Sequence, residues 1–231
     1  MVEDCRLARA SGAAPKLVFA TNGQALSLAR TNPAIREAFE EADIVHADGA
    51  VIVAAANLLT RHRILERAAT TDFIHDAAAT AVRESLSFYL LGSTESVNAA
   101  ATAELERRYP GLRIVGRRHG YFDAEEEAAI CADITAAAPD VVWVGLGKPK
   151  EQLFCVRNRH RIRAGWLITC GGCFNFLSGD YRRAPVWMQR AGLEWLHRMF
   201  TGPRTLIWRY LTTNPHALYL IATRTGKRGA P

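Results

Sequence analysis

Short runs of β-forming residues alternate with longer helical segments over most of this chain. The predicted strands span 16–20, 44–47, 87–91, 113–115, 141–145 and 166–170. The segments between them are rich in alanine and glutamate, and helices are predicted at 23–30, 32–41, 50–59, 72–83, 96–108, 124–138 and 150–161. This alternation predicts an α/β fold, in which a mostly parallel sheet is covered by helices on both faces.

The carboxyl ends of the predicted strands are where a ligand should bind, because ligands of open parallel sheets occupy the crevice beyond those ends. That rule selects residues 20–22, 47–49, 91–94, 120–121, 145–150 and 171–175. No strand is predicted after Gly179, and 185–200 and 203–223 have helical character. We therefore expect two parts, a sheet domain at 1–180 and a helical appendage at 181–231.

The positive charge of the chain lies in the predicted appendage. The formal net charge is +6, and the stretch 195–231 has no Asp or Glu but contains the cations Arg198, Arg204, Arg209, Arg224, Lys227 and Arg228. These cations alternate with large apolar residues such as Trp195, Phe200, Trp208 and Tyr219. A merely solvated basic tail does not need so many apolar groups, so the pattern favours contact with anionic lipid, a phosphorylated substrate or nucleic acid.

The rest of the composition indicates a globular protein of the cytoplasm. Hydrophobic residues make up 49% of the chain, which is enough for a core, and no apolar run reaches the roughly 18 residues of a membrane span. The first twenty residues contain early acidic side chains and no signal-type hydrophobic segment, so we expect no secretory signal. The five cysteines are scattered and odd in number, as is typical of reduced thiols.

Two polar groups follow the first and second predicted strands. Asp48 and Gly49 come directly after 44–47, where a carboxylate is well placed to act as a general base. The alternative is that Asp48 is the N-cap of the following helix, which from spacing alone is at least as well supported. Thr21 and Asn22 follow the first strand and offer a hydroxyl and an amide to a ligand, although they fit a loop and helix cap equally well.

Glycine-rich turns follow two later strands, at Gly145 and Gly147 and at Gly171 and Gly172. Such turns let backbone N–H groups approach a phosphate closely. The glycines lack both the Walker spacing and the dinucleotide fingerprint, so a nicotinamide dehydrogenase is a poor fit. The turns therefore predict an anion site of another kind.

Two further features have competing interpretations. Arg67 is a candidate to grip a diphosphate, and its alternative is a surface ion pair with Glu66 or Asp72. Cys170 and Cys173 have the spacing of a metal or redox pair, but no second pair completes a zinc site. We therefore interpret Cys170 as a buried strand residue and Cys173 as a small loop filler, and we expect no metal site.

The motifs that identify the chain occur in order along nearly its whole length. They read TNGQ, ADGA, LERAATTD, YLLGSTE, RYPGLRIVGRRHGYF, APDVVWVGLGKPKEQ, CGGCFNFLSGDYRRAPVWMQRAGLEWLHR and RYLTTNP. From about Lys16 to about Pro215 the chain thus resembles the WecG/TagA/CpsF family of bacterial glycosyltransferases. The block RAPxWMQxxGLEWLHR is highly specific, and so is the combination of GLGxPK with GGxFxFxxG at this distance.

This resemblance implies a Rossmann-like fold and an inverting glycosyltransferase. The implied donor is a UDP-sugar, and the implied acceptor is a polyprenyl-diphosphate-linked saccharide at the inner face of the cytoplasmic membrane. Such an enzyme would act in cell-envelope or exopolysaccharide synthesis as a peripheral membrane protein, with no cofactor. A homo-oligomer is an open alternative to a monomer.

The resemblance also assigns roles to residues. Asp48 matches the candidate catalytic base, Asn22 the asparagine of the first loop, and Arg67 an arginine of the pocket; we add Thr21 to this catalytic set. The expected substrate contacts are Gly49, Tyr121, Gly145, Gly147, Lys150, Glu151, Gln152, Gly171, Gly172, Asn175, Arg183, Arg198, Arg204 and Arg209. The arginines of the appendage resemble those proposed to engage the acceptor's diphosphate.

Two rival classes remain open at this stage. One is a non-catalytic nucleotide-binding module at the membrane surface, which UDP release in the presence of a lipid acceptor would exclude. The other is a nucleic-acid-binding protein, suggested only by the sequence pI of 9.3. No DNA-binding motif is evident and the charge sits in one apolar-rich tail, so we expect no nucleic-acid partner.

Overall fold

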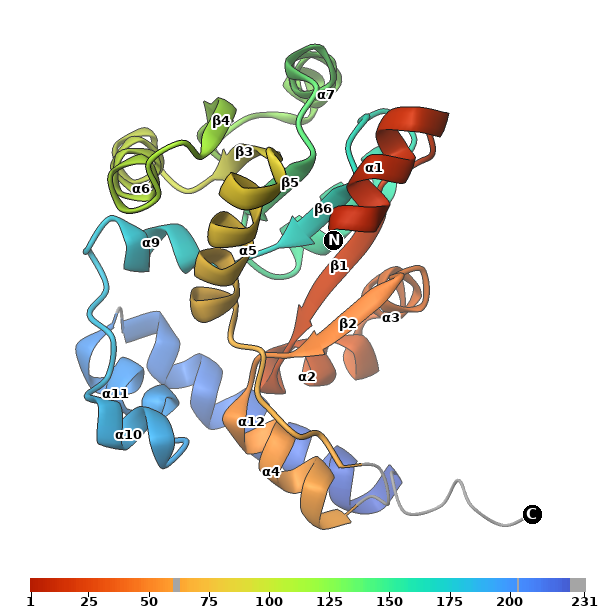
Figure 1. The fold of residues 1–231 in the computed structure, drawn as a ribbon. Helices are drawn as coiled ribbons and strands as arrows, with labels where there is room; N and C mark the ends of the chain where they lie inside the picture. The colour runs from red at the N-terminus through yellow and green to blue at the C-terminus, as the bar shows by residue number, and fades with distance from the viewer. Residues whose placement is uncertain (60–62, 203, 225–231) are drawn as a thin grey trace.

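A single parallel sheet forms the centre of the protein. In the computed structural model, which describes residues 1–59, 63–202 and 204–224, six strands pair in the order β2-β1-β6-β5-β3-β4. Every neighbouring pair is parallel. Figure 1 shows the sheet, whose strands are β1 (Lys16–Thr21), β2 (Ile44–Ala47), β3 (Ser87–Gly92), β4 (Arg113–Arg118), β5 (Val141–Gly145) and β6 (Trp166–Thr169). The predicted α/β fold is confirmed, and every strand lies at its predicted place.

The helices between the strands also match the predicted ranges within a few residues. They are α2 (Gly23–Thr31), α3 (Pro33–Glu40), α4 (Ala50–Leu59), α5 (Thr70–Glu84), α6 (Glu95–Arg108), a short 3-10 turn η1 (Ala124–Glu126), α7 (Glu127–Ala137) and α8 (Lys150–Asn158). Side-chain caps explain where several begin. Asn22 accepts a hydrogen bond from the N–H of Ala25, and Thr94 accepts one from Val97, which satisfies donors that a helix start leaves free.

Alternating side chains of the strands point into two separate cores. In β3, Phe88 and Leu90 pack with α1, α5 and α6, whereas Tyr89 and Leu91 pack with α3, α7 and α8. The residues of the central strands β3, β5 and β6 are all buried because both faces are covered there, whereas those of the edge strands β2 and β4 are partly or fully exposed. This is the burial expected of a parallel sheet between two helix layers.

Two helices of the sheet domain were not predicted. α1 (Val2–Ser11) precedes the first strand and packs against it through Cys5, while Trp166 donates a hydrogen bond to Asp4. α9 (Cys173–Leu177) has only five residues, too few for periodicity to show in the sequence. Its Phe174 is fully buried beside the end of β5.

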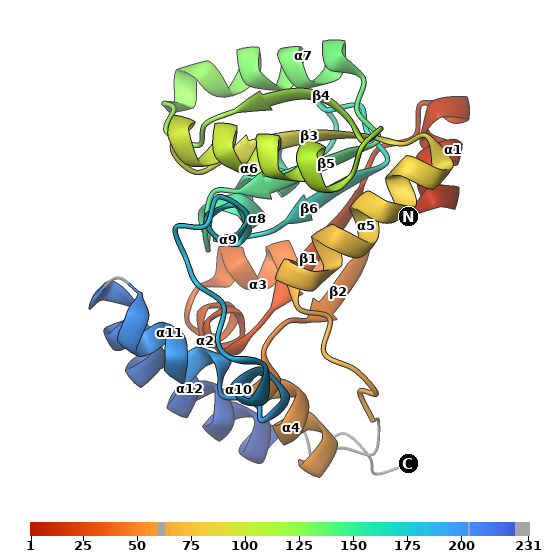
Figure 2. The same ribbon diagram turned by 60° about the vertical axis from the view of Figure 1, so that its left-hand side comes forward.

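The C-terminal segment forms three helices rather than the two predicted. They are α10 (Val186–Arg190), α11 (Glu194–Thr201) and α12 (Arg204–Arg224). Gly192, whose φ is 71°, separates α10 from α11, because a left-handed residue ends a helix. Figures 1 and 2 show α10, α11 and α12 gathered with α4 below the sheet, on the side of the strands' carboxyl ends.

Helix α12 is attached to the sheet domain through α2 and α4. Ala217 and Ile221 share a small apolar cluster with Ile52 and Ala55 of α4. On the α2 side, Ser27 and His216 are joined by a hydrogen bond of 2.8 Å. The division at residue 180 stays a prediction, but these contacts place the appendage directly over the ligand-binding end of the sheet.

Candidate functional site

A cavity of about 180 Å³ lies where the sheet domain meets the C-terminal helices. Asn22, Asp48, Gly147 and Gly171, which line it, follow β1, β2, β5 and β6, and these four strands are neighbours in the sheet. Their carboxyl ends therefore meet at one edge, as the crevice rule requires. The opposite wall comes from α11, the turn before it and α12, and consists of Gly192, Glu194, Trp195, Arg198, Arg209, Tyr210, Thr213 and Asn214.

Asp48 lies in this cavity, directly after β2. Its N–H donates to the carbonyl of Thr21 at 2.9 Å, and its Oδ1 accepts the N–H of Thr70 at 3.2 Å. Thr70 begins α5 rather than the helix that follows Asp48 in the chain. The carboxylate thus caps a different helix from the one proposed as the alternative, while it still faces the cavity.

The first loop holds Asp48 in place. Thr21 contributes its backbone carbonyl to this contact and is not among the described residues that line the cavity. The Asn22 side chain caps α2 through its oxygen. Gly49 packs so closely on Asn22 that a Cβ at Gly49 would lie 3.2 Å from the Cβ of Asn22. This close approach explains the glycine after Asp48.

Glu151 joins two of the glycine turns. Its carboxylate has no exposed surface, and its Oε2 accepts hydrogen bonds from the N–H groups of Gly147 and Gly171, at 3.1 and 2.9 Å. The sequence led us to expect these amides to bind phosphate. In the structure their hydrogens point at Glu151, because a fully buried carboxylate must be satisfied by donors from the protein.

The neighbours of Glu151 have different surroundings. The amine of Lys148 lies 3.4 Å from Glu151 and lines the cavity, with its side chain 8% exposed. Gln152 is buried behind Glu151, to which its amide donates. Lys150 is exposed at the start of α8 and lies outside the cavity wall. The cation that the sequence missed at this turn is therefore Lys148, one position before the proline.

Gly145 and Gly172 have separate roles. Gly145 is buried at the end of β5, and a Cβ there would lie 3.0 Å from the carbonyl oxygen of Gly171. Gly145 thus permits close packing of β5 against β6 and does not line the cavity. Gly172 lines the cavity just before α9.

Two arginines of the appendage line the cavity. Arg198 stacks over the ring of Phe176 at 5.0 Å, and Arg209 stacks over Tyr210 at 4.7 Å. The Nε atoms of both are buried, and neither has a hydrogen-bond partner within the described part of the chain. Buried donors of this kind are normally satisfied, so these arginines are suited to an anionic ligand. The side chain of Arg204, and Lys227 and Arg228, lie outside the described residues.

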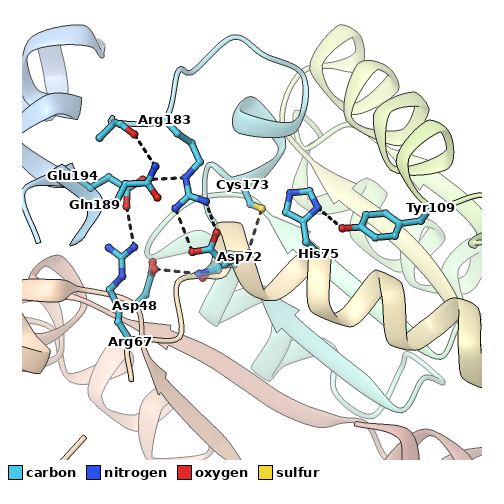
Figure 3. Close-up of polar contacts among 11 residues, drawn as sticks. Asp48, Arg67, Asp72, His75, Tyr109, Cys173, Arg183, Gln189 and Glu194 are labelled. Atoms are coloured by element: carbon cyan, nitrogen blue, oxygen red, sulfur yellow. Dashed lines mark hydrogen bonds and ion pairs between the residues drawn. The ribbon is translucent and has the colours of Figure 1, made fainter. Parts of the chain in front are cut away.

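Arg67 is held by a carboxylate from the appendage. Its terminal nitrogen lies 3.0 Å from Glu194 at the start of α11, and the guanidinium of Arg183 lies 3.4 Å from the same carboxylate. Arg183 also pairs with Asp72. Figure 3 shows Glu194 between the two arginines. The partner of Arg67 is thus neither Glu66 nor Asp72, which the sequence had suggested as alternatives.

Electrostatics raise the pKa of Arg183 in this network. Burial opposes its charged form most strongly, but the hydrogen bond to Asp72 and the charges of Asp72 and Glu194 outweigh that effect. Arg183 does not itself line the cavity in the described chain. Arg183 pairs with the two carboxylates Asp72 and Glu194, and its contact with substrate stays a prediction.

Tyr121 and Asn175 lie outside the cavity, toward the ends of β3 and β4. The ring of Tyr121 is 73% exposed, and the Asn175 oxygen accepts a hydrogen bond from Ser93 at 3.4 Å. Ser93 also joins the loop of Gly120, whose N–H donates to its carbonyl. These residues mark a second polar area along the same edge of the sheet, where their predicted nucleotide contacts stay a prediction.

The cysteine pair has structural surroundings. Cys170 and Cys173 are both buried free thiols, and Cys173 donates to the carbonyl of Thr70 at 3.7 Å. Burial raises the pKa of both thiols well above the ordinary value, so neither is a thiolate at neutral pH. Over 1–59, 63–202 and 204–224, no group of three His, Cys, Asp or Glu side chains is arranged to hold a metal ion.

The sequence interpretation missed several residues of the site. Glu194, Lys148, Thr70 and the ring of Phe176 line the cavity but were not selected. Glu194 belongs to the block that identified the family, and its position two residues after Gly192 marks a helix start. That signal could have indicated an ordered carboxylate near the arginines, although not which arginine it binds.

Large apolar side chains are exposed on the appendage. Trp187, Phe200, Trp208 and Tyr219 on α10–α12 are each at least 63% exposed. None of the helices in the described ranges is both long and apolar enough to span a bilayer.

Comparisons with known proteins identify relatives of the whole chain. The Glycosyl transferase WecG/TagA/CpsF family matches residues 2–230. The chain is 29% identical over 184 residues to the N-acetylglucosaminyldiphosphoundecaprenol N-acetyl-beta-D-mannosaminyltransferase of Bacillus subtilis, covering 78% of this chain and 69% of that protein. It is also 29% identical over 187 residues to the protein of the same name from Bacillus spizizenii, covering 81% and 71% respectively.

Proposed function

This chain belongs to the glycosyl transferase WecG/TagA/CpsF family, and from that premise we propose that it moves a sugar from a UDP-sugar to a polyprenyl-diphosphate-linked saccharide, with inversion at the anomeric carbon. The two Bacillus relatives are named for transfer of an N-acetylmannosaminyl group to a diphosphoundecaprenol-linked N-acetylglucosamine. We extend to this chain the class of acceptor, a lipid diphosphate that carries an amino sugar. The proposed place of the enzyme is polysaccharide synthesis for the cell envelope.

One observation carries the proposal. The cavity holds a carboxylate, Asp48, on the side of the sheet, and four cations, Arg67, Lys148, Arg198 and Arg209, around it. A base facing an anion site is the arrangement that a direct displacement of UDP requires. One carboxylate acting as base, with the acceptor attacking opposite the leaving group, produces inversion in a single step.

Asp48 is the proposed general base. Its Oδ1 accepts the N–H of Thr70, which fixes the direction of the carboxylate while the second oxygen is left for the acceptor hydroxyl. In the transition state the hydroxyl proton passes to Asp48 as the new glycosidic bond forms. The bond from the anomeric carbon to the UDP oxygen breaks at the same time, and its electron pair leaves with UDP.

The departing diphosphate is proposed to be stabilised by side chains rather than by the glycine turns. The N–H groups of Gly147 and Gly171 donate to Glu151. Arg198 and Arg209 have buried Nε donors without a partner among the described residues, and Arg67 supplies further guanidinium donors. Arginine suits this role because its planar fork matches phosphate oxygens.

We propose peripheral attachment to the cytoplasmic face of the membrane through α10–α12. Exposed aromatic rings and a basic C-terminal sequence are the two features that interfacial proteins combine. The same helices form one wall of the cavity. Attachment there would bring the head group of a lipid-linked acceptor to Asp48 without removing its chain from the bilayer.

The test uses a panel of UDP-sugars with a membrane lipid extract as acceptor, and follows UDP release. The wild type is expected to release UDP only when both substrates are present. Asp48→Asn should reduce kcat at least a hundredfold and leave UDP affinity within about threefold, because the asparagine oxygen can still cap α5. Asp133→Asn, on the exposed surface of α7, is the control. Full activity of Asp48→Asn would remove Asp48 from the mechanism.

A further inference from the structure

Glu194 is a buried carboxylate placed between two arginines of different origin. Arg67 comes from the segment that leads into α5, and Arg183 comes from the connection between α9 and α10. Their guanidinium groups lie 3.0 and 3.4 Å from the two oxygens of Glu194, whose side chain is 10% exposed. Figure 3 shows the resulting chain of charges from Asp72 through Arg183 and Glu194 to Arg67. Each charge in it is balanced by its neighbours.

The two arginines differ in how far their orientation depends on Glu194. Arg183 has a second anionic partner, Asp72, so it stays in place without Glu194. Within the described chain, Glu194 is the one side chain that forms a hydrogen bond or ion pair with the guanidinium of Arg67. The orientation of Arg67 therefore depends on Glu194 far more than the orientation of Arg183 does.

The contact with Glu194 leaves most of Arg67 available. It uses one terminal nitrogen of a guanidinium that has five N–H donors. Arg67 and Glu194 both line the cavity. The remaining donors can therefore face a ligand while Glu194 anchors the far edge of the guanidinium. Because the side chain is already ordered, a phosphate contact costs less side-chain entropy.

We infer that Glu194 is a positioning residue, which orients Arg67 toward the diphosphate and does so only when α11 is docked. This inference rests on the proposed function, because it assumes that Arg67 binds the leaving group. It gives the appendage a role beyond closing the cavity. Gly192 packs on α4, where a Cβ would lie 3.2 Å from the Cβ of Ala50, so the turn before α11 lies directly against the helix that follows Asp48 and Gly49.

Substitution of Glu194 by glutamine separates this role from simple packing. Glutamine keeps the shape but has one oxygen, which can accept from only one of the two arginines. Its NH₂ group then faces the other guanidinium, donor against donor. Arg183 retains Asp72 whichever way the amide turns, whereas Arg67 either loses its acceptor or keeps only a weaker, uncharged one, so the loss falls on the orientation of Arg67.

The experiment is a double-mutant cycle read by isothermal titration with inorganic pyrophosphate, a probe of the anion site that needs no sugar or acceptor. The proteins are the wild type, Arg67→Ala, Glu194→Gln and the double variant. We expect Arg67→Ala to weaken pyrophosphate binding at least tenfold and Glu194→Gln to weaken it about fivefold. The double variant should bind within twofold of Arg67→Ala, because Glu194 acts through Arg67.

The matched control is Glu104→Gln. Glu104 also pairs with two arginines, Arg107 and Arg108, but lies on the surface of α6, and its substitution should leave pyrophosphate binding unchanged. If Glu194→Gln binds pyrophosphate as well as or better than the wild type, the positioning role is wrong, since the carboxylate would then only repel the ligand. The positioning role is also wrong if the losses of pyrophosphate affinity in the two single variants add up fully in the double variant.

The outcomes distinguish this inference from the proposed function. Pyrophosphate binding with additive losses contradicts the role of Glu194 alone. Coupled losses without any UDP release in the transfer assay contradict the proposed reaction and leave the role of Glu194 intact. A wild type that does not bind pyrophosphate contradicts both, because the anion site would then not exist.

Discussion

The carboxylate of Glu151 accepts a hydrogen bond of 2.9 Å from the backbone N–H of Gly171, twenty residues later in the chain. The same oxygen accepts the N–H of Gly147. Glu151 on α8 thereby ties the end of β5 to the end of β6, below the floor of the cavity. The turns beside the cavity keep their shape because this buried charge is satisfied by backbone amides and by Lys148.

Replacing Glu151 by glutamine should destabilise the protein by about 1–3 kcal/mol. The glutamine oxygen can still accept from both glycines, but its NH₂ group would face the amine of Lys148 and the amide of Gln152, both of which donate to Glu151. Chemical denaturation measures the loss. The added change Lys148→Met should recover part of it, because it removes one of the opposed donors. If Glu151→Gln is as stable as the wild type, the proposed role of Glu151 in tying β5 to β6 is wrong.

The exposed aromatic residues of the appendage should control membrane binding. We expect the double variant Trp187→Ser and Trp208→Ser to bind about tenfold less to vesicles of anionic phospholipid in a sedimentation assay, because two interfacial anchors are lost. Both rings are at least 65% exposed, so the fold should survive. Leu7→Ser, an exposed apolar residue of α1, is the control. Unchanged sedimentation of the double variant would place the attachment elsewhere.

Sugar transfer should not depend on a divalent cation. Arg67, Lys148, Arg198 and Arg209 all line the cavity proposed to hold the diphosphate and can balance its charge. Activity after treatment with excess EDTA is expected to stay within twofold of the untreated enzyme. An EDTA-induced loss that added Mg²⁺ restores would show that the cations of the cavity are insufficient.

The stability of the fold should decrease as the pH falls below about 6.5. Burial lowers the pKa of His75 from its ordinary value of 6.5, aided by the charge of Arg108. The unfolded chain then binds a proton more readily than the folded chain does, so stability present above pH 6.5 is lost on acidification. His75→Gln should reduce the slope of unfolding free energy against pH by up to about 1.4 kcal/mol per pH unit.

Thermal or denaturant unfolding at several pH values between 7.5 and about 5 measures this slope. Burial also lowers the pKa of His46, so part of the wild-type dependence should persist in His75→Gln. His160→Gln, at an exposed histidine, is the matched control and should keep the wild-type slope. A slope in His75→Gln as steep as in the wild type would contradict the assignment.

Local sequence patterns were sufficient for the strands of the sheet domain and for the helices between them. The central strands form where runs such as Val141–Gly145 are apolar throughout and must be covered on both faces. The same reasoning located Asp48, since the residue after a parallel strand lies at the ligand-binding edge. Helix α9 escaped prediction because five residues do not complete a recognisable period.

What the sequence determined by itself was the order of elements, the family motifs and the residue types that could carry the chemistry. Only the tertiary structure decided which partners those residues have. The strand order places the ends of β1, β2, β5 and β6 side by side, and that order is not local information. It assigns the amides of Gly147 and Gly171 to Glu151 and assigns Arg67 to Glu194, 127 residues away. A charged group finds its partner through packing of distant segments, and one-dimensional spacing cannot encode that choice.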